Sequence, residues 1–401
     1  MTSRQRMLIA MANGRPDMVP VAPDTSNMIP CRLTGKPFWD IYLYQDPPLW
    51  EAYVHCHKHF GFDGWQPAVP LQLDYEMEQA AERPQWTEAI VHRTEERIYT
   101  RRYRVGAPVP GAHEGCAPED RRTYASSARN NAPQEWTDWC TVYYLADPPT
   151  WNVPLRKVGL PEGPPDEWED VVPRTHYPGR EAYDRCRALT GEDGVVGVAV
   201  GTPMLALSAE AAYEWADNRD AVIKRCEAQG EACVRRAQEI VKLKPDFVLT
   251  GGSGMMINNP EPIFRILCLP TIKEVTRICK EAGVPTQIHC CGPERDLVRI
   301  CAEETDLSSI NPLEIPPMGD CDLADLKRRY GPKIGLMGNL HTTDVMLRGT
   351  PETVIEASKR AIDDAGEGGG FILSTGDQCG RDTPDENIHA MIETARTYGK
   401  Y

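Results

Sequence analysis

The chain has 401 residues, of which 41% are hydrophobic, and it carries a formal net charge of −15. This length and composition allow a sizeable core in one large domain or two ordinary ones. The acidic balance argues against nucleic acid as the main partner, because phosphate binding needs a basic surface. No stretch approaches the roughly 18 uncharged apolar residues of a membrane span.

The N-terminal stretch 1–17 predicts an amphipathic helix with Thr2 or Ser3 as its cap. Its apolar run is too short and too interrupted for a signal peptide. Most of the 14 cysteines stand singly, which is typical of small buried hydrophobes in a reduced protein. These features together predict a cytoplasmic protein.

Short apolar runs alternate with helical patterns along much of the chain, and each run ends in glycine or polar residues. We expect strands at 19–23, 64–70, 195–200, 246–252, 285–291, 307–314, 333–339 and 370–376. Helices are expected between and after the later strands, at 206–217, 219–243, 260–283, 294–304, 322–331, 350–366 and 384–399. Eight such strands without a glycine-rich dinucleotide loop favour a (β/α)8 TIM barrel, an α/β fold, over a doubly wound sheet.

The region 71–194 interrupts this alternation, because it is rich in proline, tryptophan and charged residues. Within it, 89–108 alternates as a β-hairpin does. We interpret residues 1–401 as a single barrel domain with 71–194 as a large insertion between strands 2 and 3. The insertion would form a lid or an oligomer contact, such as that of a homodimer.

Polar side chains follow the expected strands, and in a barrel the carboxyl ends of the strands carry the chemistry. The strand at 285–291 ends in His289, Cys290 and Cys291. In an extended chain alternate side chains share a face, so His289 and Cys291 should lie together and Cys290 should face the other way. His289 and Cys291 are therefore predicted to supply two ligands of a metal site.

A third ligand would come from the end of the last strand, where Asp377 and Cys379 are the two candidates. Glu314, after another strand, would be a displaceable fourth donor. Three protein ligands and an open position are typical of catalytic zinc, and thiolate ligands favour zinc over magnesium or calcium. The alternative is a buried His–Cys pair that holds no metal.

Several of these stretches resemble the uroporphyrinogen decarboxylase superfamily, which consists of (β/α)8 barrels. The resemblance rests on "TQIHCCG", on "INPLEIPPMGDCDLADLKRRYG" with the residues that follow, on "GFILSTGDQCG" and on the opening "RMLIAMANGRPDMVPV". It covers both ends and most of the C-terminal half, but it leaves 71–194 unmatched.

The superfamily has two main activities. Its decarboxylases meet the carboxylates of a tetrapyrrole with arginines of an N-terminal Met-Arg-Gln-Ala-Gly-Arg motif. The matching place here reads "VAPDTSNMIPCRLTGKPFW", in which Arg32 is the single arginine. This departure counts against the decarboxylase reading, which stays as the alternative, for a small or tetrapyrrole acid.

The other branch comprises zinc-dependent methyltransferases of corrinoid pathways, which carry a His-x-Cys pair and a later cysteine. His289 and Cys291 match the pair directly. The later cysteine of the family falls where this chain has Asp377, and Cys379 stands two residues further on. We assign Cys379 as the third ligand because thiolate is the better zinc ligand, with Asp377 as the alternative.

The remaining candidates are assigned by role. His341 would donate a hydrogen bond or act as acid or base, with an ordinary loop residue at a helix N-terminus as the alternative, and Glu314 and Asp377 complete the catalytic set. Substrate contacts are assigned to Asn339, Met255, Met256 and Gln378. For the segment that holds the two methionines, an ordinary tight turn is the alternative.

The resemblance thus implies a zinc-dependent methyltransferase, of O-demethylase type if the methyl donor is a methoxylated aromatic. It would move a methyl group between a methylated small molecule and a corrinoid (cobalamin) cofactor. The sequence has no Asp-x-His-x-x-Gly corrinoid signature, so a separate corrinoid protein would carry the cofactor.

Overall fold

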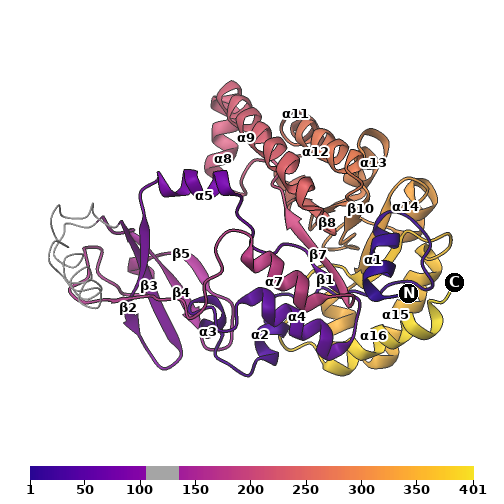
Figure 1. Ribbon diagram of the computed structural model, residues 1–401, viewed down its shortest axis with the longest axis horizontal. Helices are drawn as coiled ribbons and strands as arrows, with labels where there is room; N and C mark the ends of the chain where they lie inside the picture. Colours follow the sequence, from indigo (N-terminus) through magenta and orange to yellow (C-terminus); the bar gives the residue numbers. More distant parts are fainter. Residues whose placement is uncertain (105–134) are drawn as a thin grey trace. The chain divides into compact units, whose positions relative to one another are not determined.

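The computed structural model describes residues 1–104 and 135–401, and the chain divides into two compact units (Figure 1). The first unit comprises Met1–Leu33, Trp50–Leu71 and Arg180–Tyr401. The second comprises Thr34–Leu49 and Gln72–Gly179. None of the helices in the described residues is long and apolar enough to span a membrane.

A seven-stranded parallel sheet forms the centre of the first unit. Its order follows the chain: β1 (Gly64–Gln66), β7 (Gly194–Ala199), β8 (Phe247–Gly251), β9 (Thr286–His289), β10 (Ser309–Asn311), β11 (Gly335–Leu340) and β12 (Phe371–Thr375). Most positions in these strands are buried, since helices cover one face and inward side chains fill the other. The six strands expected in the C-terminal half are all present, each within two residues of its predicted start.

The expected strand at 19–23 is reduced to an isolated parallel bridge between Val21 and Leu373. On the side away from β12, the carbonyl of Val21 accepts a hydrogen bond from the N–H of Asp63, just before β1. A longer ladder does not form because the segment contains two prolines, and proline has no N–H to donate. The sheet therefore has seven strands and one bridged segment where eight strands were predicted.

Helices follow the strands as expected. The first unit contains α1 (Ser3–Met11), α2 (Met28–Leu33), α4 (Leu49–Phe60), α7 (Glu181–Thr190), α8 (Ala209–Asp217), α9 (Arg219–Ile240), α10 (Met255–Asn258), α11 (Glu261–Leu267), α12 (Leu269–Glu281), α13 (Arg295–Glu304), α14 (Leu323–Tyr330), α15 (Pro351–Ala365) and α16 (Asp385–Tyr398). Two 3-10 or π turns, η2 (Val241–Leu243) and η3 (Thr342–Leu347), complete the set.

Two details of these helices test the sequence predictions. Thr2 caps α1 and forms a capping box with Gln5, which confirms one of the two expected caps. The single helix expected at 260–283 is wrong, because the chain breaks at Cys268 into α11 and α12. Proline enters the first turn of α12, where its missing N–H is tolerated, but it cannot continue α11.

Inward-facing residues fill the sheet toward the amino ends of its strands. Residues of α1 pack there with Trp65, Phe247 and Met337. The indole Nε1–H of Trp65 donates a hydrogen bond to Oε1 of the buried Gln287 at 2.9 Å, so this polar atom inside the sheet has a hydrogen-bond partner. Because this end is filled, the carboxyl ends of the strands are left to carry functional side chains.

The second unit is built on an antiparallel sheet of order β5-β4-β3-β2-β6. Its elements are α3 (Phe38–Tyr42), α5 (Asp74–Ala81), β2 (Trp86–Arg93), β3 (Arg97–Arg104), β4 (Trp139–Tyr144), β5 (Thr150–Pro154), η1 (Leu155–Lys157) and β6 (Glu169–Asp170). Strands β2 and β3 confirm the expected hairpin as far as Arg104, and its last residues lie outside the described ranges. A lid or dimer role for 71–194 stays a prediction.

Candidate metal centre

The end of β9 brings two soft donors together. Nε2 of His289 lies 3.1 Å from Sγ of Cys291. Cys290, between them, is fully buried in the main hydrophobic core. The N–H of Cys290 still donates to the carbonyl of Asn311 at 3.0 Å, so the ladder continues one residue past β9, and the two candidate ligands lie on one face.

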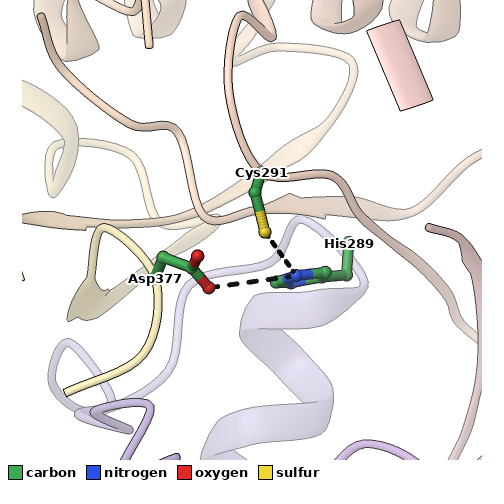
Figure 2. Close-up of side chains that lie close together, drawn as sticks. All are labelled: His289, Cys291 and Asp377. Carbon is green, nitrogen blue, oxygen red and sulfur yellow. Dashed lines mark hydrogen bonds and ion pairs between the residues drawn. The ribbon is translucent and has the colours of Figure 1, made fainter. Parts of the chain in front are cut away.

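Asp377 joins this pair from the end of β12. One oxygen of its carboxylate, Oδ1, lies 4.0 Å from Nε2 of His289, and Figure 2 shows both interactions of the ring. The chain turns at Asp377 with φ +99°, and Oγ1 of Thr375 holds the turn by donating to the carbonyl of Asp377 at 2.8 Å. One atom each of His289, Cys291 and Asp377 lies within 4.8 Å of the other two.

Cys379, which we assigned as the third ligand, is not in this group. Its N–H donates to the carbonyl of Asp24 at 2.9 Å, and its thiol interacts with the side chain of Thr375. Burial raises the pKa of the thiol to about 12. The turn at Asp377 explains the difference, because it ends the extended stretch and carries Cys379 into the core, where no solvent reaches it.

The three side chains fit a zinc ion. Donors around tetrahedral zinc lie about 3.3–3.6 Å apart, given Zn–N and Zn–S bonds of roughly 2.0 and 2.3 Å. The 3.1 and 4.0 Å separations bracket this range. Among the described residues, Oδ1 of Asp377 and Nδ1 of His289 are buried without a hydrogen-bond partner. An imidazole, a thiol and a carboxylate form a donor set that zinc accepts.

Burial sets the protonation of the site in the absence of a cation. It lowers the pKa of His289 and raises that of Cys291, and the carboxylates of Asp377 and Glu314 add to the rise for the thiol. Ser253 opposes that rise through a hydrogen bond to Cys291. A divalent cation would favour the thiolate, because its charge exceeds that of any nearby group.

Glu314 lies beside the ligand loop without joining the three-residue group. It is buried, and its Oε2 accepts a hydrogen bond from the N–H of Gly292, directly after Cys291. Burial raises its pKa, and the charge of Asp377 raises it further. The carboxylate therefore anchors the loop that carries Cys291, and its role as a displaceable ligand stays a prediction.

His341 and Asn339 stand at the end of β11. Nδ1 of His341 accepts from the N–H groups of Thr343 and Asp344, at 3.2 and 3.0 Å, and so caps η3. A neutral ring with Nδ1 as acceptor carries its proton on Nε2, which is left as a donor. Nδ2 of Asn339 donates to the carbonyl of Leu313 at 3.1 Å and holds the loop after β10.

The other assigned substrate residues are not gathered at the group. Met255 is fully buried, and Met256 is 9% exposed in the same core cluster as Cys290. Both methionines pack in the same core as Cys290, whereas the sequence analysis assigned them to substrate contacts. Gln378 is exposed.

Sequence reasoning missed Asp24 and the contact of Ser253 with Cys291. Asp24 follows the 19–23 segment, and its pKa is raised to about 7 by burial and by the charge of Asp377. Its carboxylate accepts from the N–H of Ser26 at 2.8 Å. Asp24 directly follows the expected strand 19–23, so the search for polar residues at strand ends could have selected it from the sequence.

Known proteins similar to this chain include both methyltransferases and decarboxylases. Residues 204–398 match the family Uroporphyrinogen decarboxylase (URO-D). Methylcobamide:CoM methyltransferase MtbA of Methanosarcina mazei is 32% identical over 132 residues, 32% of this chain and 35% of that protein. Uroporphyrinogen decarboxylase of Serratia proteamaculans is 33% identical over 81 residues, 20% of this chain and 22% of that protein. The matched part thus spans about a third of these curated relatives or less.

Among solved structures, a methyltransferase from Methanosarcina mazei superposes with a TM-score of 0.59 over 99% of both chains, at 16% identity. At this identity the match shows that the two chains share a fold. The family model matches just under half of the chain, and the curated matches cover about a third of it or less. Residues 204–398 of this chain therefore match the uroporphyrinogen decarboxylase family, and its curated relatives include both methyltransferases and decarboxylases.

Proposed function

We propose that the protein is a zinc-dependent methyltransferase that moves a methyl group between a methylated small molecule and a corrinoid. The observation that carries this proposal is the convergence of His289, Cys291 and Asp377 at the carboxyl ends of β9 and β12. Similarity to methylcobamide:CoM methyltransferases supports the corrinoid link.

A zinc ion held by these residues would act as a Lewis acid on a thiol or ether oxygen of the small molecule. The protein supplies the rest. Glu314 fixes the loop of Cys291 through the Gly292 N–H, so the sulfur keeps its position beside His289. Nδ1 of His341 is used by the cap, so Nε2–H, 4.0 Å from the carboxylate of Asp344, would donate a hydrogen bond or proton toward the reacting group.

The decarboxylase alternative is weaker on the same observations. Recognition of a tetrapyrrole acid requires arginines that face the ligand carboxylates. Arg32, the one candidate in the matching segment, pairs with Asp385 at 2.5 Å. Its guanidinium is therefore already committed to a carboxylate of the protein.

Further parts of the proposal concern the setting of the reaction. We infer a separate corrinoid protein as the partner, a cytoplasmic location, and a barrel completed by the 19–23 segment with 71–194 as its insertion. A methoxylated aromatic as the methyl donor would make the protein an O-demethylase.

Metal analysis and a transfer assay test this function. Protein purified without chelator should contain about one zinc per chain. The zinc-loaded protein should form methylcobalamin from a methylated compound and a reduced, Co(I) corrinoid, and chelation should abolish the reaction. Absence of bound zinc, together with carbon dioxide release from an acid substrate, would favour the decarboxylase instead.

A further inference from the structure

The side-chain amide of Asn311 lies on the inner face of the sheet, next to the candidate metal centre. Asn311 ends β10 and is the register partner of His289 on β9, and its carbonyl accepts from the N–H of Cys290 at 3.0 Å. The preceding residue, Ile310, packs in the main hydrophobic core with Ile288, so by alternation Asn311 projects from the opposite, inner face. Register partners share a face and neighbouring strands are about 4.8 Å apart, so the amide stands beside the imidazole.

The Oδ1 atom of Asn311 is buried without a hydrogen-bond partner among the described residues, and the whole residue is only 2% exposed. Gln287 faces the same interior one layer closer to the amino ends of the strands, and both ends of its amide are bonded. Its Oε1 accepts from Trp65 at 2.9 Å, and its Nε2 donates to Sδ of Met337 at 3.4 Å. The interior is therefore packed below Asn311, so a partner for its amide has to come from the carboxyl ends of the strands.

The metal centre beside this amide is reachable from solvent. The side chains of His289 and Asp377 are 17% and 27% exposed. Gly251, the register partner of His289 on β8, contributes no side chain to the interior on the other side of the ring. A small molecule whose reacting atom meets a zinc ion at this centre would therefore have the Asn311 amide as its neighbour on the β10 side.

We propose that Asn311 determines the specificity of this site, and that its amide binds a hydroxyl group close to the reacting sulfur or oxygen of the small molecule. This inference rests on the proposed methyl transfer and names its substrate class as hydroxyl-bearing thiols or ethers. Rotation about the Cβ–Cγ bond brings either end of the amide to the ligand, and a hydroxyl pairs with both, because it donates to Oδ1 and accepts from Nδ2. An analogue that lacks the hydroxyl would leave the amide unpaired.

Two pairs of compounds isolate the hydroxyl group: 2-mercaptoethanol with ethanethiol, and 2-methoxyphenol with methoxybenzene. In the thiol assay the cobalt–carbon bond of methylcobalamin breaks, and its electron pair stays on cobalt as Co(I). The sulfur forms the new bond to the methyl carbon, and the thiol proton goes to solvent. In the ether assay Co(I) attacks the methyl carbon, and the oxygen leaves with the electron pair of the broken bond and takes a proton from solvent. Binding of the thiols is read separately, from the sulfur-to-cobalt absorption of the full-length protein loaded with Co(II) in place of zinc.

The zinc-loaded protein should use the hydroxyl-bearing member of the reactive pair with a kcat/KM about tenfold higher or more. Because the members also differ in intrinsic reactivity, Asn311→Leu supplies the internal test and should lower this ratio by about fivefold or more. Zinc content and unfolding temperature should hold in this variant, because Oδ1 of Asn311 has no partner in the described protein to lose. Asn387→Leu is the matched control, since this buried amide on α16 donates to the carbonyls of Met346 and Gly349. It should lower the unfolding temperature and leave the ratio unchanged.

Each outcome separates the two proposals. Equal use of both members of a pair by the parent, or an Asn311→Leu ratio that matches the parent, would overturn the hydroxyl assignment while methyl transfer stands. Loss of zinc in Asn311→Leu, with the same loss of rate for every compound, would also overturn it and make Asn311 a positioning residue for His289. Failure of all four compounds to react, with no change of the Co(II) spectrum by either thiol, would instead overturn the methyltransferase function, and the substrate class with it.

Discussion

The ends of β9 and β12 both contribute to the candidate metal centre, but only the first follows the alternation of an extended chain. After β9, His289 and Cys291 share a face and Cys290 takes the other. After β12, the same spacing separates Asp377 from Cys379, yet the positive φ at Asp377 sends Cys379 into the core. Side-chain alternation therefore predicts partners only as far as the backbone stays extended.

The largest effect is expected at the end of β9. Cys291→Ala should lose zinc and lower methyl transfer by more than about 100-fold, because it removes a ligand. Cys290→Ala should keep zinc and cost about 1–2 kcal/mol of stability through a small core cavity. Metal content, transfer rate and thermal unfolding measure the pair. Equal retention of zinc by both variants would contradict the facing of the two cysteines.

The end of β12 gives the next largest contrast. Asp377→Ala should weaken zinc binding by about 10–100-fold, since the carboxylate lies 4.0 Å from the His289 ring nitrogen. Cys379→Ala should bind zinc normally and unfold at a temperature lower by about 2–4 °C. Titration with a zinc-specific chelator resolves the affinities. A loss of zinc in Cys379→Ala alone would show that the loop rearranges when metal binds.

A smaller effect is expected at His341, at the end of β11. His341→Ala should lose the η3 cap, at a cost of about 1 kcal/mol, and lower the transfer rate by about 100-fold if Nε2 donates to substrate. His341→Asn should restore the cap, because asparagine is a good N-cap, but it should not restore the rate. Recovery of both properties in His341→Asn would mean that the imidazole has only a structural role.

The sequence predicted those features of the structure that depend on interactions between neighbouring residues. The short β-branched run that became β7, the Thr2 cap and the facing of His289 and Cys291 all depend on residues a few positions apart. The break at Cys268 is also local, because proline follows it closely, and the sequence analysis overlooked it.

The positions of the residues that lie outside the group depend instead on contacts across the fold. Cys379 is held by Asp24, which is distant in sequence, and Met255 and Met256 enter a core that many elements share. The bridge at Val21 pairs with Leu373 at the far end of the chain. Sequence spacing carries no information on such pairings, so ligand preference alone could not predict that Asp377, and not Cys379, lies beside His289 and Cys291.

The smallest expected effect concerns how the loop after β9 is anchored. Glu294, three residues past Cys291, is fully buried, and its Oε2 accepts from the N–H of Leu313. The loop after β12 is anchored by a neutral backbone bond between Cys379 and Asp24. A carboxyl group in the first anchor makes that loop, unlike the second, sensitive to pH.

Burial raises the pKa of Glu294 well above its usual 4.5, and the charges of Glu314 and Asp320 add to the rise. Between pH 4.5 and the folded-state pKa, the folded protein keeps a proton that the unfolded chain releases. The free energy of unfolding therefore falls as pH rises, by up to about 1.4 kcal/mol per pH unit from this group.

Glu294→Gln, which mimics the protonated acid, should remove that part of the slope, as urea unfolding between pH 5 and pH 7 would measure. Since Leu313 can donate to the glutamine amide oxygen, stability at pH 5 should change little. An unchanged slope would mean that Glu294 is already ionised when folded, and that the loop after β9 is held by charge rather than by a neutral carboxyl group.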